Sequence, residues 1–111
     1  MEIQGKFMTL AEVLASIDEE WLWKADLFIA GKYPWNPESN CFVFTGDEED
    51  IPEVEEELKK THNMKHIIQT VDVVMIVDYA ERQVADVTMQ QLVDSFNYYW
   101  RYDAPLDFDD E

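Results

Sequence analysis

The sequence predicts a single α+β domain in which a short β-sheet packs against three to four helices. Its 111 residues are 47% hydrophobic and 14% aromatic, which supplies enough apolar material for one core. Segments with helical spacing of apolar residues are interspersed with short β-branched and aromatic runs, but the two do not alternate regularly as they do in parallel α/β folds. No repeat or domain boundary divides the chain, so residues 1–111 are expected to form one domain that ends in a short acidic tail of about 103–111.

The first half of the chain is expected to hold one helix and two strands. Thr9 and Glu12 have the spacing of a capping box, which predicts a helix over Leu10–Ile17. The aromatic segment that follows predicts a strand near Trp21–Trp23. Residues 31–40 contain two prolines and are expected to form a loop, which we call the proline loop. The β-branched and aromatic run Cys41–Thr45 that follows predicts a second strand.

The second half begins with an acidic turn, Gly46–Asp50, and a predicted helix over Pro52–Lys60, since proline suits the first helical turn. Residues 64–68 predict a third strand. Thr70 is expected to cap a helix over Val71–Gln83, although the β-branched residues of that segment also suit a buried strand. Both alternatives for this segment stay open.

The last helix is the clearest element of the sequence. Thr88 and Gln91 form a second capping box, which predicts a helix over Met89–Tyr102. Its apolar residues recur three and four positions apart, so we expect one face of the helix to enter the core. The residues of this inward face are Met89, Leu92, Val93, Phe96, Tyr99 and Trp100.

Acidic residues outnumber basic residues by 25 to 8, which gives a formal net charge of -17. Such a polyanion is repelled by nucleic acid phosphates and anionic lipid headgroups, so neither direct nucleic-acid binding nor membrane binding is expected. The N-terminal residues lack the pattern of a signal peptide, and no apolar run approaches the ~20 residues that span a bilayer. These features favour a cytoplasmic protein whose partner is basic.

The acidic residues are concentrated, because eight of them lie within the eleven positions Asp47–Glu57. A helix N-terminus favours carboxylates, and Glu55 and Glu56 are spaced to form ion pairs one turn further on, with Lys59 and Lys60. This local explanation does not cover the four consecutive acids at the start, so two interpretations stay open: a solvated helix entrance, or a contact surface for a cationic partner. The candidate partner-binding carboxylates are those of Asp47, Glu48, Glu49, Asp50, Glu53, Glu56 and Glu57.

Two aromatic residues are further candidates for partner contact. Trp35 lies among the turn-forming residues of the proline loop, where an aromatic side chain either folds back onto the core or serves as an interface anchor. Tyr98 lies on the side of the last helix opposite its predicted core face. Both belong to the candidate site, although core packing is the favoured interpretation for Trp35.

The sequence contains no motif for catalysis or for cofactor binding. Cys41 is the only cysteine, so an intramolecular disulfide is impossible, and its place at the start of an apolar run predicts a buried thiol. His62 and His66 are four residues apart and could bind zinc from one helix face. Glu57 or Asp72 would supply a further ligand, but no HExxH pattern or cysteine pair completes the set. The acidic stretch also lacks the central glycine of an EF-hand loop, so no metal, cofactor or enzyme activity is expected.

In its size, its charge and the segment TMQQLVDSFNYYWRYDAPLDF, the chain resembles the small acidic immunity proteins of bacteria. Those proteins act against nuclease toxins of contact-dependent growth inhibition and related toxin systems. The resemblance implies an inhibitor that binds and neutralises a cognate basic toxin, a nuclease, by placing carboxylates where the toxin binds phosphates. It transfers no individual binding residue. The alternatives are a phage-type nucleic-acid mimic that blocks a host defence nuclease, and an acidic interaction domain without an inhibitory role.

Overall fold

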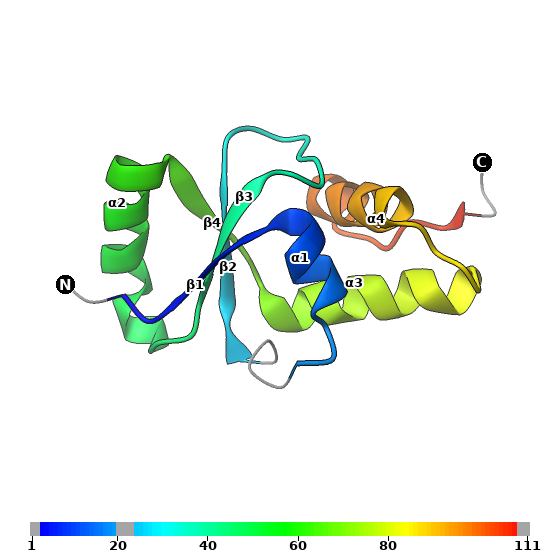
Figure 1. Cartoon of the computed structure of the whole chain (residues 1–111), viewed down its shortest axis with the longest axis horizontal. Coiled ribbons are helices and arrows are strands. Elements are labelled where there is room, and N and C mark those ends of the chain that lie inside the picture. The colour runs from blue at the N-terminus through cyan, green and yellow to red at the C-terminus, as the bar shows by residue number, and fades with distance from the viewer. Residues whose placement is uncertain (1–2, 20–23, 109–111) are drawn as a thin grey trace.

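A four-stranded antiparallel β-sheet separates two layers of helices in the computed structural model, which describes residues 3–19 and 24–108 (Figure 1). The strands, in the spatial order β1-β3-β2-β4, are β1 (Gly5–Thr9), β2 (Asp26–Ala30), β3 (Asn40–Phe44) and β4 (Met64–Gln69). The helices are α1 (Leu10–Ala15), α2 (Ile51–His62), α3 (Thr70–Gln83) and α4 (Met89–Tyr102), and a short 3₁₀-helix, η2 (Glu48–Asp50), leads into α2. The predicted α+β class is confirmed. Within this described part, every helix is too short or too polar to cross a lipid bilayer.

The two faces of the sheet are covered by different helices, because successive side chains of a strand point to opposite faces. Helix α2 lies against one face, and α1, α3 and α4 lie against the other (Figure 1). The smaller core, on the α2 side, consists of Phe28, Phe42, Phe44, Val54, Leu58 and Met64. The larger core includes Leu27, Ile29, Cys41 and Val43 from the sheet, Val13 and Leu14 from α1, Val73, Ile76 and Val77 from α3, and Leu92, Val93 and Phe96 from α4.

Both capping boxes form as predicted, and they fix where α1 and α4 begin. The Thr9 hydroxyl accepts a hydrogen bond from the N–H of Glu12, and the Glu12 carboxylate accepts one from the N–H of Thr9. Thr88 and Gln91 make the equivalent pair at the start of α4. These bonds satisfy N–H groups that a helix start leaves without a partner. Helix α4 spans the predicted residues, whereas α1 ends earlier than predicted, at Ala15.

Two strands differ from the sequence prediction. The strand predicted near Trp21–Trp23 falls on residues 20–23, outside the described part of the chain, and a strand instead occupies Asp26–Ala30 of the same apolar segment. Strand β1 has no counterpart in the prediction, because its sequence GKFMT lacks a clear alternation and the strand forms by pairing with β3. A glycine is needed at Gly5, where a Cβ atom would lie 2.3 Å from the carbonyl oxygen of Val43.

Residues 71–83 are helical, which decides between the two alternatives for this segment. The prediction that Thr70 caps the helix is wrong: Gln69 is the N-cap, and Thr70 is the first residue of α3 and fully buried. The Thr70 hydroxyl accepts a hydrogen bond from the N–H of Ala25 at 3.1 Å and donates one to the Ala25 carbonyl at 3.0 Å. Thr70 therefore ties the start of α3 to the residue that precedes β2.

The C-terminal segment is docked on the helices as far as Phe108. The Gln83 side chain donates a hydrogen bond to the carbonyl of Leu106 at 2.9 Å and accepts one from the N–H of Phe108 at 3.0 Å. The Tyr79 hydroxyl donates to a carboxylate oxygen of Asp107 at 2.6 Å, and Phe108 packs against the larger core. The described part of the predicted acidic tail therefore belongs to the fold.

We expect Thr70→Val to lower the free energy of unfolding by about 1–3 kcal/mol, because it leaves the buried N–H of Ala25 without its hydroxyl partner. Chemical denaturation followed by tryptophan fluorescence measures the change. Thr61→Val is the matched control, since the Thr61 hydroxyl bonds the Glu57 carbonyl on the exposed side of α2, where water replaces a lost bond. Equal effects of the two substitutions would contradict the structural role of Thr70.

Cys41 is fully buried in β3, as the sequence predicts, and burial raises the pKa of its thiol to about 12. The thiol therefore stays protonated at neutral pH, whereas the thiolate is the reactive form. We expect folded protein to react with a thiol reagent on the order of 100-fold more slowly than protein unfolded in urea. Rapid labelling of the folded protein would show that Cys41 is accessible.

Candidate functional site

The orientation of α2 decides which of its carboxylates face solvent. Val54 and Leu58 lie one turn apart, and both are buried against the aromatic residues of the smaller core. Since they fix the inner side of the helix, Glu53, Glu56 and Glu57 point away from the sheet and are exposed. The predicted helix is confirmed and is slightly longer than expected, because it begins at Ile51 and ends at His62.

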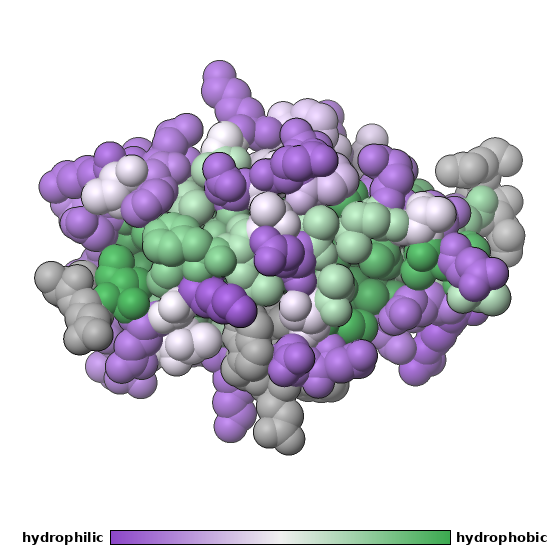
Figure 2. Space-filling model, in the orientation of Figure 1, coloured by the Kyte–Doolittle hydropathy of each residue, from purple (hydrophilic) through white to green (hydrophobic). Residues whose placement is uncertain are grey.

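The four acids before α2 extend the same surface. Asp47, Glu48, Glu49 and Asp50 are all exposed, and the predicted turn contains η2, which continues directly into α2. Neither Asp47 nor Asp50 uses its carboxylate to cap the helix that follows it. We call the side chains of Asp47, Glu48, Glu49, Asp50, Glu53, Glu56 and Glu57 the acidic surface. Figure 2 shows hydrophilic residues gathered over α2, at the left of the view.

The acidic surface is poorly neutralised within the described part of the chain. Its one ion pair joins Glu56 to Lys60 at 3.8 Å, as predicted, and both side chains are 72% exposed, so solvent screens the attraction. Glu55, which the sequence pairs with Lys59, instead accepts a hydrogen bond from the N–H of His66 at 2.7 Å. Seven exposed carboxylates therefore remain with one lysine contact among them.

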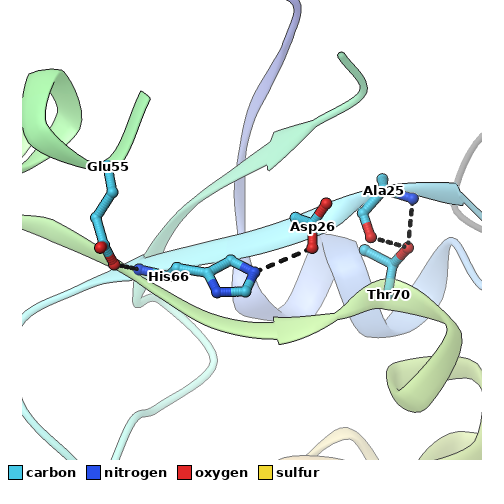
Figure 3. A network of polar contacts seen from close by, with 5 residues as sticks. All are labelled: Ala25, Asp26, Glu55, His66 and Thr70. Atoms are coloured by element: carbon cyan, nitrogen blue, oxygen red, sulfur yellow. Dashed lines mark hydrogen bonds and ion pairs between the residues drawn. The ribbon is translucent and has the colours of Figure 1, made fainter. Parts of the chain in front are cut away.

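A chain of polar contacts holds α2 to the sheet (Figure 3). Glu55 reaches from α2 to the backbone of His66 in the edge strand β4. The imidazole Nε2 of His66 lies 3.0 Å from a carboxylate oxygen of Asp26 in β2, and Asp26 is 5% exposed. The carboxylates of Glu55 and Asp26 are therefore engaged with His66 inside the fold. Only the remaining carboxylates of this region are available for a partner.

The two histidines do not form a common metal site. His62 lies at the end of α2, where its ring centroid is 4.7 Å from that of Phe7, and it shares a hydrogen bond with Thr61. His66 lies in a strand and faces Asp26, so the two residues do not share a helix face. Among residues 3–19 and 24–108, no group of three or more His, Cys, Asp or Glu side chains is arranged to hold a metal ion.

The two aromatic candidates do not join the acidic surface. Trp35 is 4% exposed and packs edge to face against Phe96 and Trp100, so its side chain belongs to the core. Tyr98 is half-buried on α4, which lies on the opposite face of the sheet from α2 (Figure 1). Trp100, which the sequence places on the inward face of α4, is 39% exposed, although its ring still contacts Trp35.

The structure adds a groove near Tyr98 that the sequence did not indicate. Its volume is about 420 Å³, and its lining includes Tyr33, Asp94 and Tyr102. The spacing of Asp94, Tyr98 and Tyr102, four residues apart, is a signal that could have placed these three side chains along one side of the helix. Tyr33 comes from the proline loop, and no local pattern links it to them.

The protein is thus a small α+β domain that carries an exposed acidic helix on one side of its sheet. The chain belongs to the family described as a domain of unknown function, DUF7716, whose sequence model matches residues 7–108. The match begins in β1 and ends at the docked residue Phe108, so it includes the whole acidic surface and the groove. No curated protein and no solved structure matches the chain.

We expect Glu55→Ala to speed the amide hydrogen exchange of His66 by about 10-fold, because it removes the carboxylate that engages this N–H at the edge of the sheet. Exchange followed by NMR measures the effect residue by residue. Glu57→Ala, on the exposed side of the same helix, should leave the exchange of His66 unchanged. If Glu55→Ala has no effect either, α2 is not held to β4 through this contact.

Proposed function

We propose that the protein is an immunity-type inhibitor, which binds and neutralises a cognate basic toxin, a nuclease, through the acidic surface. The observation that carries this proposal is the set of seven exposed carboxylates on one continuous segment with a single lysine contact. A nuclease binds its substrate through positive charge at phosphate positions. Carboxylates placed at those positions cover the substrate site and exclude the nucleic acid.

The spacing of the charges supports this proposal. At a rise of about 2.0 Å per residue in the 3₁₀-helix and about 1.5 Å in the α-helix, the helical residues of Asp47–Glu57, which begin at Glu48, cover roughly 16 Å. One strand of DNA carries a phosphate every ~3.4 Å along the helix axis, so the segment matches the length of about five phosphates. The segment is therefore long enough to occupy a substrate channel rather than a single phosphate site.

The rigidity of α2 also supports an inhibitory role. Val54 and Leu58 anchor the helix to the sheet, and Glu55 fixes it to β4. Charges held at fixed positions bind with a smaller loss of conformational entropy than charges on a mobile tail. Binding to a basic partner also relieves the self-repulsion of a chain with a net charge of -17.

To test this function, the partner is captured from cells that produce the protein, and its nuclease activity is measured with and without added protein. We expect a basic nuclease whose activity falls to background when one equivalent of the protein is added, and one toxin rather than several targets. Binding to many unrelated nucleic-acid proteins would favour the phage-type mimic. Binding without loss of nuclease activity would reduce the role to that of an acidic interaction domain.

The acidic surface is tested by changing Glu48, Glu49, Glu53 and Glu56 to Gln together. We expect association with the partner to slow by about 10-fold or more at low salt, because clustered carboxylates steer a cationic partner by long-range attraction. The dependence of the rate on ionic strength should flatten in the same variant. Thermal stability should stay equal or rise, since exposed like charges are removed. Stopped-flow binding at two salt concentrations and thermal unfolding measure these effects.

The matched control changes four exposed acids elsewhere, Glu19, Glu38, Glu81 and Asp86, to their amides. It alters the net charge of the protein by the same amount but leaves the acidic surface intact. We expect a much smaller change in the association rate. Equal behaviour of the two variants would show that the acidic surface is a solvated helix entrance and has no particular role in binding.

A further inference from the structure

A second surface lies on the other side of the sheet from α2, where a groove of about 420 Å³ runs between the proline loop, α4 and the docked C-terminal segment. Aromatic rings form much of its wall. Tyr33 is 38% exposed and Tyr102 is 61% exposed, and the rings of Tyr98 and Tyr102 lie 4.6 Å apart. Exposed tyrosines around a concave site are typical of the residues that dominate binding at protein interfaces.

Hydrogen bonds hold each wall of the groove in place, so its shape does not depend on a ligand. Asn97 of α4 accepts a hydrogen bond from the N–H of Trp35 at 3.1 Å and donates one to its carbonyl at 2.9 Å. This pair fixes the proline loop against α4. Gln83 holds the backbone of Leu106 and Phe108 in the same way, which fixes the C-terminal wall. A preformed site of this kind loses little entropy on binding.

The charge of the groove selects a cation. Asp94 is exposed at its rim and receives a hydrogen bond from the Gln90 amide at 2.9 Å, which positions its carboxylate. Among the described residues that line the groove, none is Lys, Arg or His. The surrounding chain carries a net charge of -17, which attracts positive groups from a distance.

Aromatic faces favour the same kind of ligand. A cation within about 6 Å of a ring centroid is attracted by the negative face of the ring. The planar guanidinium of arginine can stack on such a ring while it donates hydrogen bonds to a carboxylate, which the compact ammonium of lysine does less well. The volume falls within the range of about 300–1,000 Å³ that accommodates small ligands, so an arginine side chain and its neighbouring backbone fit.

We propose that this groove binds an arginine side chain of a protein partner. Asp94 pairs with the guanidinium, and the rings of Tyr98 and Tyr102 contact its face. The inference does not rest on the proposed inhibition of a nuclease, because the groove and the acidic surface share no residue and are carried by α4 and α2, which lie on opposite faces of the sheet (Figure 1). Each surface can be tested while the other is intact.

The probe is the capped peptide acetyl-Gly-Arg-Gly-amide, titrated into the isotope-labelled full chain and followed by NMR. We expect saturable chemical-shift changes centred on Asp94, Tyr98 and Tyr102. The same peptide with citrulline, which has the shape of arginine without the charge, should cause no saturable shift, and the lysine peptide should bind more weakly. Equal binding of the citrulline peptide would overturn the assignment of a cation site.

Variants separate the groove from general attraction to an acidic protein. Tyr102→Leu should weaken binding of the arginine peptide by about threefold, as expected for one exposed ring contact. Adding Asp94→Asn should bring the loss to roughly tenfold. Both residues are exposed, so the fold should be retained, and the NMR spectrum reports whether it is.

The control variant is Glu53→Gln with Glu56→Gln on the acidic surface. It should leave binding of the arginine peptide in the groove unchanged. If the chemical-shift changes spread over α2 and become smaller only in this control variant, the peptide binds the acidic surface instead, and the groove proposal is wrong. A titration without any saturable shift up to millimolar peptide would overturn it as well.

Discussion

The pairing of β2 with β3 is the constraint on which both helical layers depend. The two strands lie in the centre of the sheet, and nearly all of their residues are buried on one face or the other. Phe28 lies opposite Phe42 and supports α2, whereas Leu27 and Ile29 face the opposite layer. A shift of one residue in this register would exchange the two sets of side chains, so the strands specify at once where α2 and the remaining helices pack.

The sequence predicts those parts of the fold that depend on local signals. The capping boxes at Thr9 and Thr88 place the starts of α1 and α4, because the bonds involved span only three residues. Strand β1 depends on its long-range pairing with β3, and its short sequence carries no pattern of its own. The apolar segment around β2 is hydrophobic on both faces, so it lacks the alternation that would have fixed its boundaries.

The candidate site divides in the same way. The exposure of Glu53, Glu56 and Glu57 follows from the helical spacing of the apolar residues beside them, and the sequence therefore identifies the acidic surface. The internal role of Glu55 could not be predicted, because its carboxylate accepts a hydrogen bond from the N–H of His66, which lies in a separate element. The burial of Trp35 is likewise set by contacts with α4, more than sixty residues away in sequence.

If a cationic partner covers the acidic surface, as proposed above, carboxyl footprinting of the complex will show it residue by residue. Exposed carboxylates are coupled to an amine with a carbodiimide, and mass spectrometry reads the extent of labelling at each residue with and without partner. We expect strong protection of Asp47–Asp50 and Glu53, with unchanged labelling of Glu19, Glu81 and Asp86. Unchanged labelling of Asp47–Asp50 and Glu53 in a saturated complex would contradict it.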